Sequence, residues 1–229
     1  MIADIYTMGK ELDLKVEQKK TLTTPRLPAN LPLKIMFLTF DLLYGKGRSL
    51  PKVLVLEILA RYPYWAWENG AYKLLSLWHC STKLGNPQKV KDALRHIEMG
   101  REAQDNEQWH MLLWADLCQQ QQIKLNWFKH WLLPRHMTFV YFYITRIMYW
   151  IKPIWSFRMN AAFESHAEHE YMLFAQEHPE FDTLEVDSIW FKYYPRQKSL
   201  GDLIRRVGLD ERDHMNRSLA EADRLEKCL

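Results

Sequence analysis

The stretch REAQDNEQWHMLL (residues 101–113) places a glutamate and a histidine three residues apart, at Glu107 and His110. The later stretch GLDERDHMNRS repeats this spacing with Glu211 and His214. Both stretches are rich in helix-forming residues, and residues three apart lie on one face of a helix. Each pair can therefore reach a single point beside its helix. Two such pairs predict a common centre inside a bundle of helices.

The composition favours an all-α protein. Only 8 of the 229 residues are glycine, 14% are aromatic, and leucine, methionine and the long polar residues are frequent. A formal charge of +3 is too small to indicate a nucleic-acid partner, and we expect none. The three cysteines are scattered without a CxxC spacing, which excludes a disulfide framework and a thiolate zinc site.

Apolar periodicity and proline divide the chain into an arm and one domain. Residues 1–30 are predicted to be a polar N-terminal arm that ends in the extended, proline-rich segment TTPRLPANLP, and residues 31–229 to form a single domain. Gly85 to Pro87 end a helix predicted at 49–85, and a helix predicted at 157–181 stops near Pro179. Helices are expected at 31–45, 49–85, 87–122, 126–157, 157–181 and from about Ser199 onward.

The segments 31–45 and 126–157 are strongly apolar. The first is shorter than the roughly 20 residues that span a bilayer, and Arg146 in the second would cost a spanning helix about 2.5–3.5 kcal/mol. We therefore expect two membrane-facing helices that do not span the bilayer. Burial of both helices in the core of a large bundle is the alternative.

Two further acids complete a metal-binding set. Glu57 stands alone in the apolar run KVLVLEILARY, where an ionised carboxylate is costly without a partner or a metal, and Glu164 lies in NAAFESHAEHEY. One glutamate from each of two helices and a Glu-x-x-His from each of two others is the ligand set of a di-iron four-helix bundle, the ferritin-like architecture. Chance alone yields roughly half a Glu-x-x-His in this composition, so solvated helix faces are the competing interpretation.

Five segments in order resemble those of the alternative oxidases, and most closely the plastid terminal oxidase branch. LEILARYPYWAW, NEQWHMLL and FESHAEHEY are similar to the LETIARVPY, NEMHHLL and ESHAYETY segments of that branch, and FKYY and DERDH follow. The similarity covers about residues 30–220. It implies a non-haem di-iron quinol oxidase, monotopic and homodimeric, that reduces dioxygen to water without pumping protons.

The resemblance also implies roles for individual residues. Tyr171 matches a tyrosine beside the metals, and Asn106 and Asp210 match positions that orient the ligands. Residues near the quinol would be Lys52, Leu56 and His166. The two iron ions would be bound by Glu57, Glu107, His110, Glu164, Glu211 and His214.

The chain departs from the family pattern at several positions. Lys52 replaces the usual arginine, which keeps the charge but loses the fork geometry, and the plastid insertion after KYY is absent. The N-terminus has no secretory or organelle signal, so we expect a protein on the cytoplasmic face of a bacterial inner or thylakoid-type membrane. A di-iron monooxygenase acting on a quinone precursor or lipid, and a metal-storage or structural bundle, remain alternatives.

Overall fold

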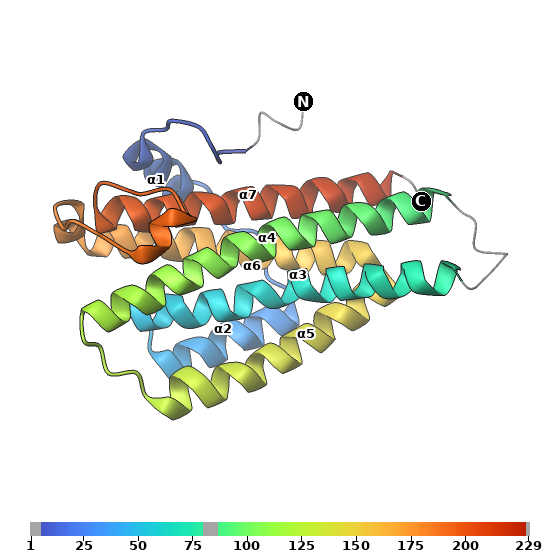
Figure 1. The fold of residues 1–229 in the computed structure, drawn as a ribbon, viewed down its shortest axis with the longest axis horizontal. Helices are drawn as coiled ribbons and strands as arrows, with labels where there is room; N and C mark the ends of the chain where they lie inside the picture. Colours follow the sequence, from blue (N-terminus) through green and yellow to red (C-terminus); the bar gives the residue numbers. More distant parts are fainter. Residues whose placement is uncertain (1–5, 80–86, 228–229) are drawn as a thin grey trace.

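Four long helices form the body of the protein. The computed structural model describes residues 6–79 and 87–227, and within them it has seven α-helices and no strand. The helices α3 (Leu50–His79), α4 (Pro87–Gln120), α6 (Pro153–Glu177) and α7 (Leu200–Glu226) run side by side (Figure 1). Helix α3 packs along α4, and α6 packs along α7. The predicted all-α, ferritin-like bundle is confirmed.

Glycines allow close approach within both helix pairs. A Cβ atom at Gly100 of α4 would lie 2.8 Å from the carbonyl oxygen of Tyr64 on α3. A Cβ atom at Gly208 of α7 would lie 2.9 Å from the Cβ atom of Tyr171 on α6. Neither contact is tolerated without movement of a backbone, so the missing side chains set the spacing of the bundle.

Two more helices lie along one edge of the bundle, α2 (Leu31–Tyr44) and α5 (Leu133–Ile151) (Figure 1). A short π-helical turn, η1 (Phe128–Leu132), leads into α5, which packs on α3 and α6. Both helices expose large apolar side chains, including Leu38 and Leu42 of α2 (73% and 81% exposed) and Phe139 of α5. Among the described residues, no helix combines the length and the apolar character needed to cross a membrane.

The N-terminal arm is not extended throughout. It contains a helix, α1 (Leu14–Thr23), capped by Asp13, and only the segment 24–30 is extended as expected. The face of α1 that is buried against α6 and α7 is polar: the side-chain amide of Gln18 donates to the carbonyl oxygen of Met172 (2.7 Å), and Thr21 donates to Glu168 (2.6 Å). The prediction missed this helix because a polar buried face has no hydrophobic period.

One predicted helix boundary is wrong, and another lies outside the described residues. The break between α5 and α6 falls at Lys152, which is extended (φ −154°), and not at residue 157. Pro153 explains this position, because proline disfavours helical backbone at the preceding residue and is well suited to the first turn of a helix. The predicted end of the helix at Gly85 lies in the undescribed residues 80–86.

The segment between α6 and α7 holds two 3₁₀ turns, η2 (Pro179–Asp182) and η3 (Ile189–Lys192). As expected, Ser199 marks the start of α7: it is the N-cap residue, and its hydroxyl accepts a hydrogen bond from the backbone N–H of Asp202 (3.1 Å). This cap satisfies one of the free N–H groups of the first turn of α7.

Candidate metal centre

The structure brings all six predicted ligand residues together inside the bundle, with contributions from α3, α4, α6 and α7. Their donor atoms form two groups, in each of which the atoms lie within 4.8 Å of one another. One group is Glu57, Glu107, His110 and Glu211, and the other is Glu107, Glu164, Glu211 and His214. Because Glu107 and Glu211 belong to both groups, the arrangement fits two neighbouring metal ions bridged by carboxylates.

The imidazole rings point into the carboxylate cluster. The Nδ1 atom of His110 lies 3.4 Å from Glu57 Oε2 and 3.3 Å from Glu211 Oε1. The Nδ1 atom of His214 lies 2.8 Å from Glu107 Oε1. The i, i+3 spacing on α4 and α7 thus places each histidine beside its own glutamate and the glutamate of the facing helix.

The polar atoms of this cluster lack hydrogen-bond partners. Both carboxylate oxygens of Glu107 and of Glu211 are buried without a partner among the described residues, as are one oxygen each of Glu57 and Glu164. Buried oxygens of this kind are rare and costly unless they bind an ion. Carboxylate oxygens with a few imidazole nitrogens suit iron or manganese, so the residues present fit the group that the ligand set predicts.

The burial and close approach of these carboxyl groups change their pKa values. Burial, together with the charges of Glu107 and Glu211, raises the pKa of Glu57 well above its usual range. Burial and the same two charges do the same to the pKa of Glu164. Burial by itself would raise the pKa of Glu107, but the adjacent Glu57 carboxyl and the His110 imidazole hold that pKa well below its usual range.

Outside the cluster, Asp210 forms a hydrogen bond with the ring of His110. Its Oδ2 atom lies 3.2 Å from His110 Nε2 and accepts a hydrogen bond from the Tyr194 hydroxyl (2.5 Å). Although Asp210 is buried, the hydrogen bond with His110 and the charge of Arg206 lower its pKa to about 2. An ionised Asp210 keeps a proton on Nε2, so Nδ1 is the nitrogen that faces the carboxylates.

The expected role of Asn106 differs from that of Asp210. Asn106 lines a hollow together with Asp210, and its buried amide oxygen has no hydrogen-bond partner among the described residues. Instead, Tyr64 donates to Glu164 Oε1 (2.6 Å) and accepts from the amide of Asn160 (3.1 Å). Neither Tyr64 nor Tyr194 was predicted, because no spacing in the sequence links them to their partners.

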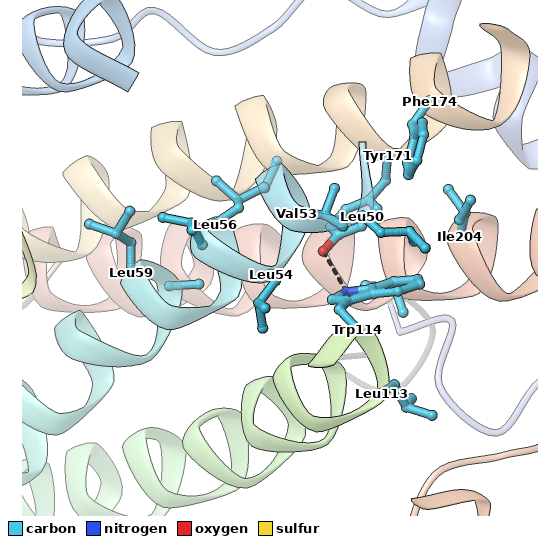
Figure 2. Packing of buried hydrophobic residues seen from close by; sticks show 14 of the residues in the cluster. Leu50, Val53, Leu54, Leu56, Leu59, Leu113, Trp114, Tyr171, Phe174 and Ile204 are labelled. Atoms are coloured by element: carbon cyan, nitrogen blue, oxygen red, sulfur yellow. Dashed lines mark hydrogen bonds between the residues drawn. The ribbon is translucent and has the colours of Figure 1, made fainter. Parts of the chain in front are cut away.

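Tyr171 lies beside the cluster, as the resemblance implied. Its hydroxyl donates to Glu57 Oε1 and accepts a hydrogen bond from the indole N–H of Trp114 (3.0 Å), the bond drawn in Figure 2. Both rings are fully buried and stack with their centroids 5.9 Å apart. Leucines and valines of α3 surround them (Figure 2), so the tyrosine hydroxyl is shielded from water.

The three residues predicted to lie near a quinol line one small cavity of about 20 Å³. Lys52 is buried in its wall and donates to Asp41 (2.9 Å) and to the carbonyl oxygen of Gly45 (2.6 Å). Such a volume holds about one water molecule, so the cavity is closed to a molecule as large as a quinol ring. It is lined by Phe40, Arg48, Lys52, Val53, Leu56, His166 and Glu170.

His166 is a neutral ring in the wall of this cavity. It stacks on Phe37 with the ring centroids 3.8 Å apart, and Arg26 donates to its Nδ1 atom (2.7 Å). Burial, partly offset by Glu170, lowers the pKa of His166 to about 4. The remaining proton of the ring is therefore on Nε2, which makes His166 a hydrogen-bond donor.

The family profile described as Alternative oxidase matches residues 10–223, nearly the whole chain. The chain belongs to the alternative oxidase family. Members of this family are di-iron proteins, which agrees with the paired ligand groups of the bundle. A search of curated proteins finds no match. Membership makes the protein an oxidoreductase associated with a membrane.

A Glu57→Gln variant should lose iron and keep its stability. The amide has the shape of the protonated carboxyl that the raised pKa of Glu57 favours, so the metal-free variant should differ from wild type by less than about 1 kcal/mol in unfolding free energy. It should bind fewer than two iron ions per chain. Iron analysis and denaturant unfolding of the metal-free protein measure both effects.

Glu221 is a matched control, since it is also a buried glutamate of a bundle helix. It is paired with His96 and Arg224, and those partners lower its pKa to about 2 despite its burial. Glu221→Gln should therefore cost about 2–3 kcal/mol and leave iron binding intact. Full iron content in Glu57→Gln would contradict the ligand assignment.

The stabilisation by iron should increase with pH. In the metal-free protein, the pKa values of Glu57, Glu164, His110 and His214 are all raised, so the folded state binds their protons more tightly than the unfolded chain does. The stability that these protons contribute is present at low pH and is lost as the pH rises above about 4.5 for the two glutamates and above about 6.5 for the two histidines. Iron displaces the same protons and so binds more tightly at high pH.

Thermal unfolding with and without Fe²⁺, measured without oxygen at pH 5.5, 7 and 8.5, tests this. The difference between the two melting temperatures should increase at each step. Asp210 does not reverse the trend, because its lowered pKa keeps it ionised throughout this range. A constant or shrinking difference would show that iron binds elsewhere.

Proposed function

We propose that the protein is a non-haem di-iron quinol oxidase, which oxidises two membrane quinols and reduces one dioxygen to two waters without pumping protons. The observation that carries the proposal is the pair of ligand groups sharing Glu107 and Glu211, with Tyr171 bonded to Glu57. Residues 31–229 would act as one oxidase domain. The proposed iron ligands are Glu57, Glu107, His110, Glu164, Glu211 and His214.

Two iron ions in this site would supply the electrons and the Lewis acidity for reduction of dioxygen. The chain supplies a dry site and control of protons. Tyr171 holds a proton at its hydroxyl oxygen between Glu57 and Trp114, and Asp210 fixes the ring of His110. The four electrons and four protons that two quinols release match those needed to form two waters, so no other reductant is required.

The quinol would bind in the closed cavity lined by Lys52, Leu56 and His166. Lys52 and the Nε2–H of His166 are donors suited to the oxygens of a quinol ring. The cavity must open before a ring can enter, and Phe37 and Phe40 of α2 are the adjacent side chains that would have to move. An apolar hollow of about 390 Å³ between α2 and α5 would admit the lipid-soluble tail.

The exposed apolar side chains of α2 and α5 support a monotopic attachment to one membrane leaflet. Aromatic rings beside basic side chains, such as Trp131 with Arg135 and Trp150 with Arg146, suit the boundary between lipid and water. We further propose a homodimer on the cytoplasmic face of a bacterial inner or thylakoid-type membrane. These points rest on the properties that the family resemblance implies.

Oxygen uptake by the purified protein tests the reaction. In detergent, iron-loaded protein given reduced quinone alone should consume oxygen in the presence of cyanide, with two quinols oxidised per oxygen. An iron-loaded preparation that consumes no oxygen would remove the oxidase proposal and favour a storage bundle. Uptake that requires a reductase and yields an oxygenated product would favour the monooxygenase, which the same ligands can serve.

Tyr171→Phe should keep two iron ions and lose at least about 100-fold in turnover, the scale of a positioned proton donor. The ring remains and only the hydroxyl between Glu57 and Trp114 is removed. Tyr149→Phe is the control, because Tyr149 is also a buried tyrosine but its hydroxyl bonds to His96, away from the cluster. Unchanged turnover in Tyr171→Phe would exclude the proton role.

Charges on α2 should weaken membrane attachment. Each leucine buried in lipid contributes about 1.5–3 kcal/mol, so the double variant Leu38→Asp and Leu42→Asp should bind liposomes at least tenfold more weakly. Leu94→Asp is the control, since Leu94 is 54% exposed on α4, outside α2 and α5. Co-sedimentation with liposomes measures the effect. Equal binding by all variants would rule out α2 as part of the attachment face.

A further inference from the structure

Residues 6–9, the N-terminal strap, lie against α7 and precede the part of the chain that matches the family. The backbone N–H of Thr7 donates to Asp213 Oδ1 (2.8 Å), and the N–H of Met8 donates to Asp213 Oδ2 (2.8 Å). The Thr7 hydroxyl also lies 2.9 Å from Asp213 Oδ2. The strap therefore satisfies a carboxylate that α7 buries almost completely.

The strap also binds Arg206 on the same helix. The guanidinium group donates to the carbonyl oxygen of Thr7 (3.2 Å) and to its hydroxyl oxygen (3.0 Å). Its Nε atom donates to Asp210 Oδ1 (3.2 Å). Since Arg206 occupies Oδ1, the other oxygen of Asp210 is left for His110 and Tyr194.

These contacts form a chain of hydrogen bonds from the strap to a proposed iron ligand, in the order Thr7, Arg206, Asp210 and His110. On α7 the spacing of Arg206, Asp210 and Asp213 is four and then three, so they share one helix face. Glu211 and His214, whose donor atoms enter the metal groups, lie on the neighbouring face. The strap therefore contacts the turns of α7 that carry the proposed ligands Glu211 and His214.

Beside the strap lies a large hollow, in which water could bond to the groups that the strap now contacts. Its volume is about 1110 Å³, and its lining includes Met8, Gly9, Arg206 and Asp210. Without Thr7, the guanidinium group of Arg206 would bond to water in this hollow and could turn away from Asp210. Asp210 would then position His110 less well, because the buried Asp210 carboxylate keeps its orientation only while Arg206 remains bonded to it.

We propose that the N-terminal strap is a positioning element of the metal centre, which acts on His110 through Arg206 and Asp210 and slows the release of iron. Its role does not require any contact with substrate. It rests on the iron ligands of the proposed function but concerns iron retention and not quinol oxidation, so its test is separate from that of the reaction.

The rate at which a chelator removes iron from the loaded protein tests this proposal. Thr7→Val, which has the same shape without the hydroxyl, and deletion of residues 1–9 should both release iron about tenfold faster, the lower end of the effect of removing a group that orients a ligand. Thr7→Ser, which restores the hydroxyl, should release iron at the wild-type rate.

Arg158→Gln is the structural control, because it removes an ion pair between α6 and the end of α7 (Arg158 to Glu226, 2.7 Å) that does not touch the strap. Its iron release should match that of wild type, and the metal-free forms of Thr7→Val and Arg158→Gln should unfold at similar temperatures. Wild-type release from both strap variants, or equally fast release from Thr7→Val, Thr7→Ser and Arg158→Gln, would overturn the proposal. If the deletion variant does not fold, the two Thr7 variants decide the outcome.

Discussion

Four glutamates and two histidines meet in the dry interior of the bundle, and the rest of the structure depends on this concentration of buried charge. Without an ion, the carboxylates can coexist only by keeping protons, which is why the pKa values of Glu57 and Glu164 are raised. An arrangement of this kind costs stability. The surrounding apolar core and the close helix contacts at Gly100 and Gly208 must offset that cost.

The hydrogen bonds around the cluster give each ligand residue a different environment. Tyr171 donates to Glu57, Tyr64 donates to Glu164, and Asp210 accepts from His110. Each partner bonds to one side-chain atom and so limits the directions in which that side chain can turn. One oxygen each of Glu57 and Glu164 and both oxygens of Glu107 and Glu211 remain without a hydrogen-bond partner among the described residues.

The molecule has two unlike sides. On one side α2 and α5 present apolar surface, and the closed cavity with Lys52 and His166 lies beneath α2. On the other side the N-terminal arm packs on α6 and α7 through polar groups. The arm contacts both the small cavity and helix α7, since Arg26 bonds to His166 and Thr7 bonds to Arg206. The arm is therefore fixed to the body of the protein at both of these points.

The local pattern of the chain was enough to predict the helical bundle and the six residues that converge. Glu-x-x-His sets two side chains on one helix face whatever the helix packs against, and an acid within VLVLEILA is expected only where it has a partner. Prolines and glycines marked most helix ends, although Lys152 was missed as a boundary. The buried polar face of α1 gave no signal, since sequence periodicity reports only apolar faces.

What the tertiary structure alone decided is which distant groups meet. Tyr64 and Glu164 are 100 residues apart, Trp114 and Tyr171 are 57 apart, and Thr7 and Arg206 are 199 apart. No spacing rule connects such residues, because their contact depends on the distance and rotation of whole helices. Those quantities follow from packing across the entire core, to which every helix contributes.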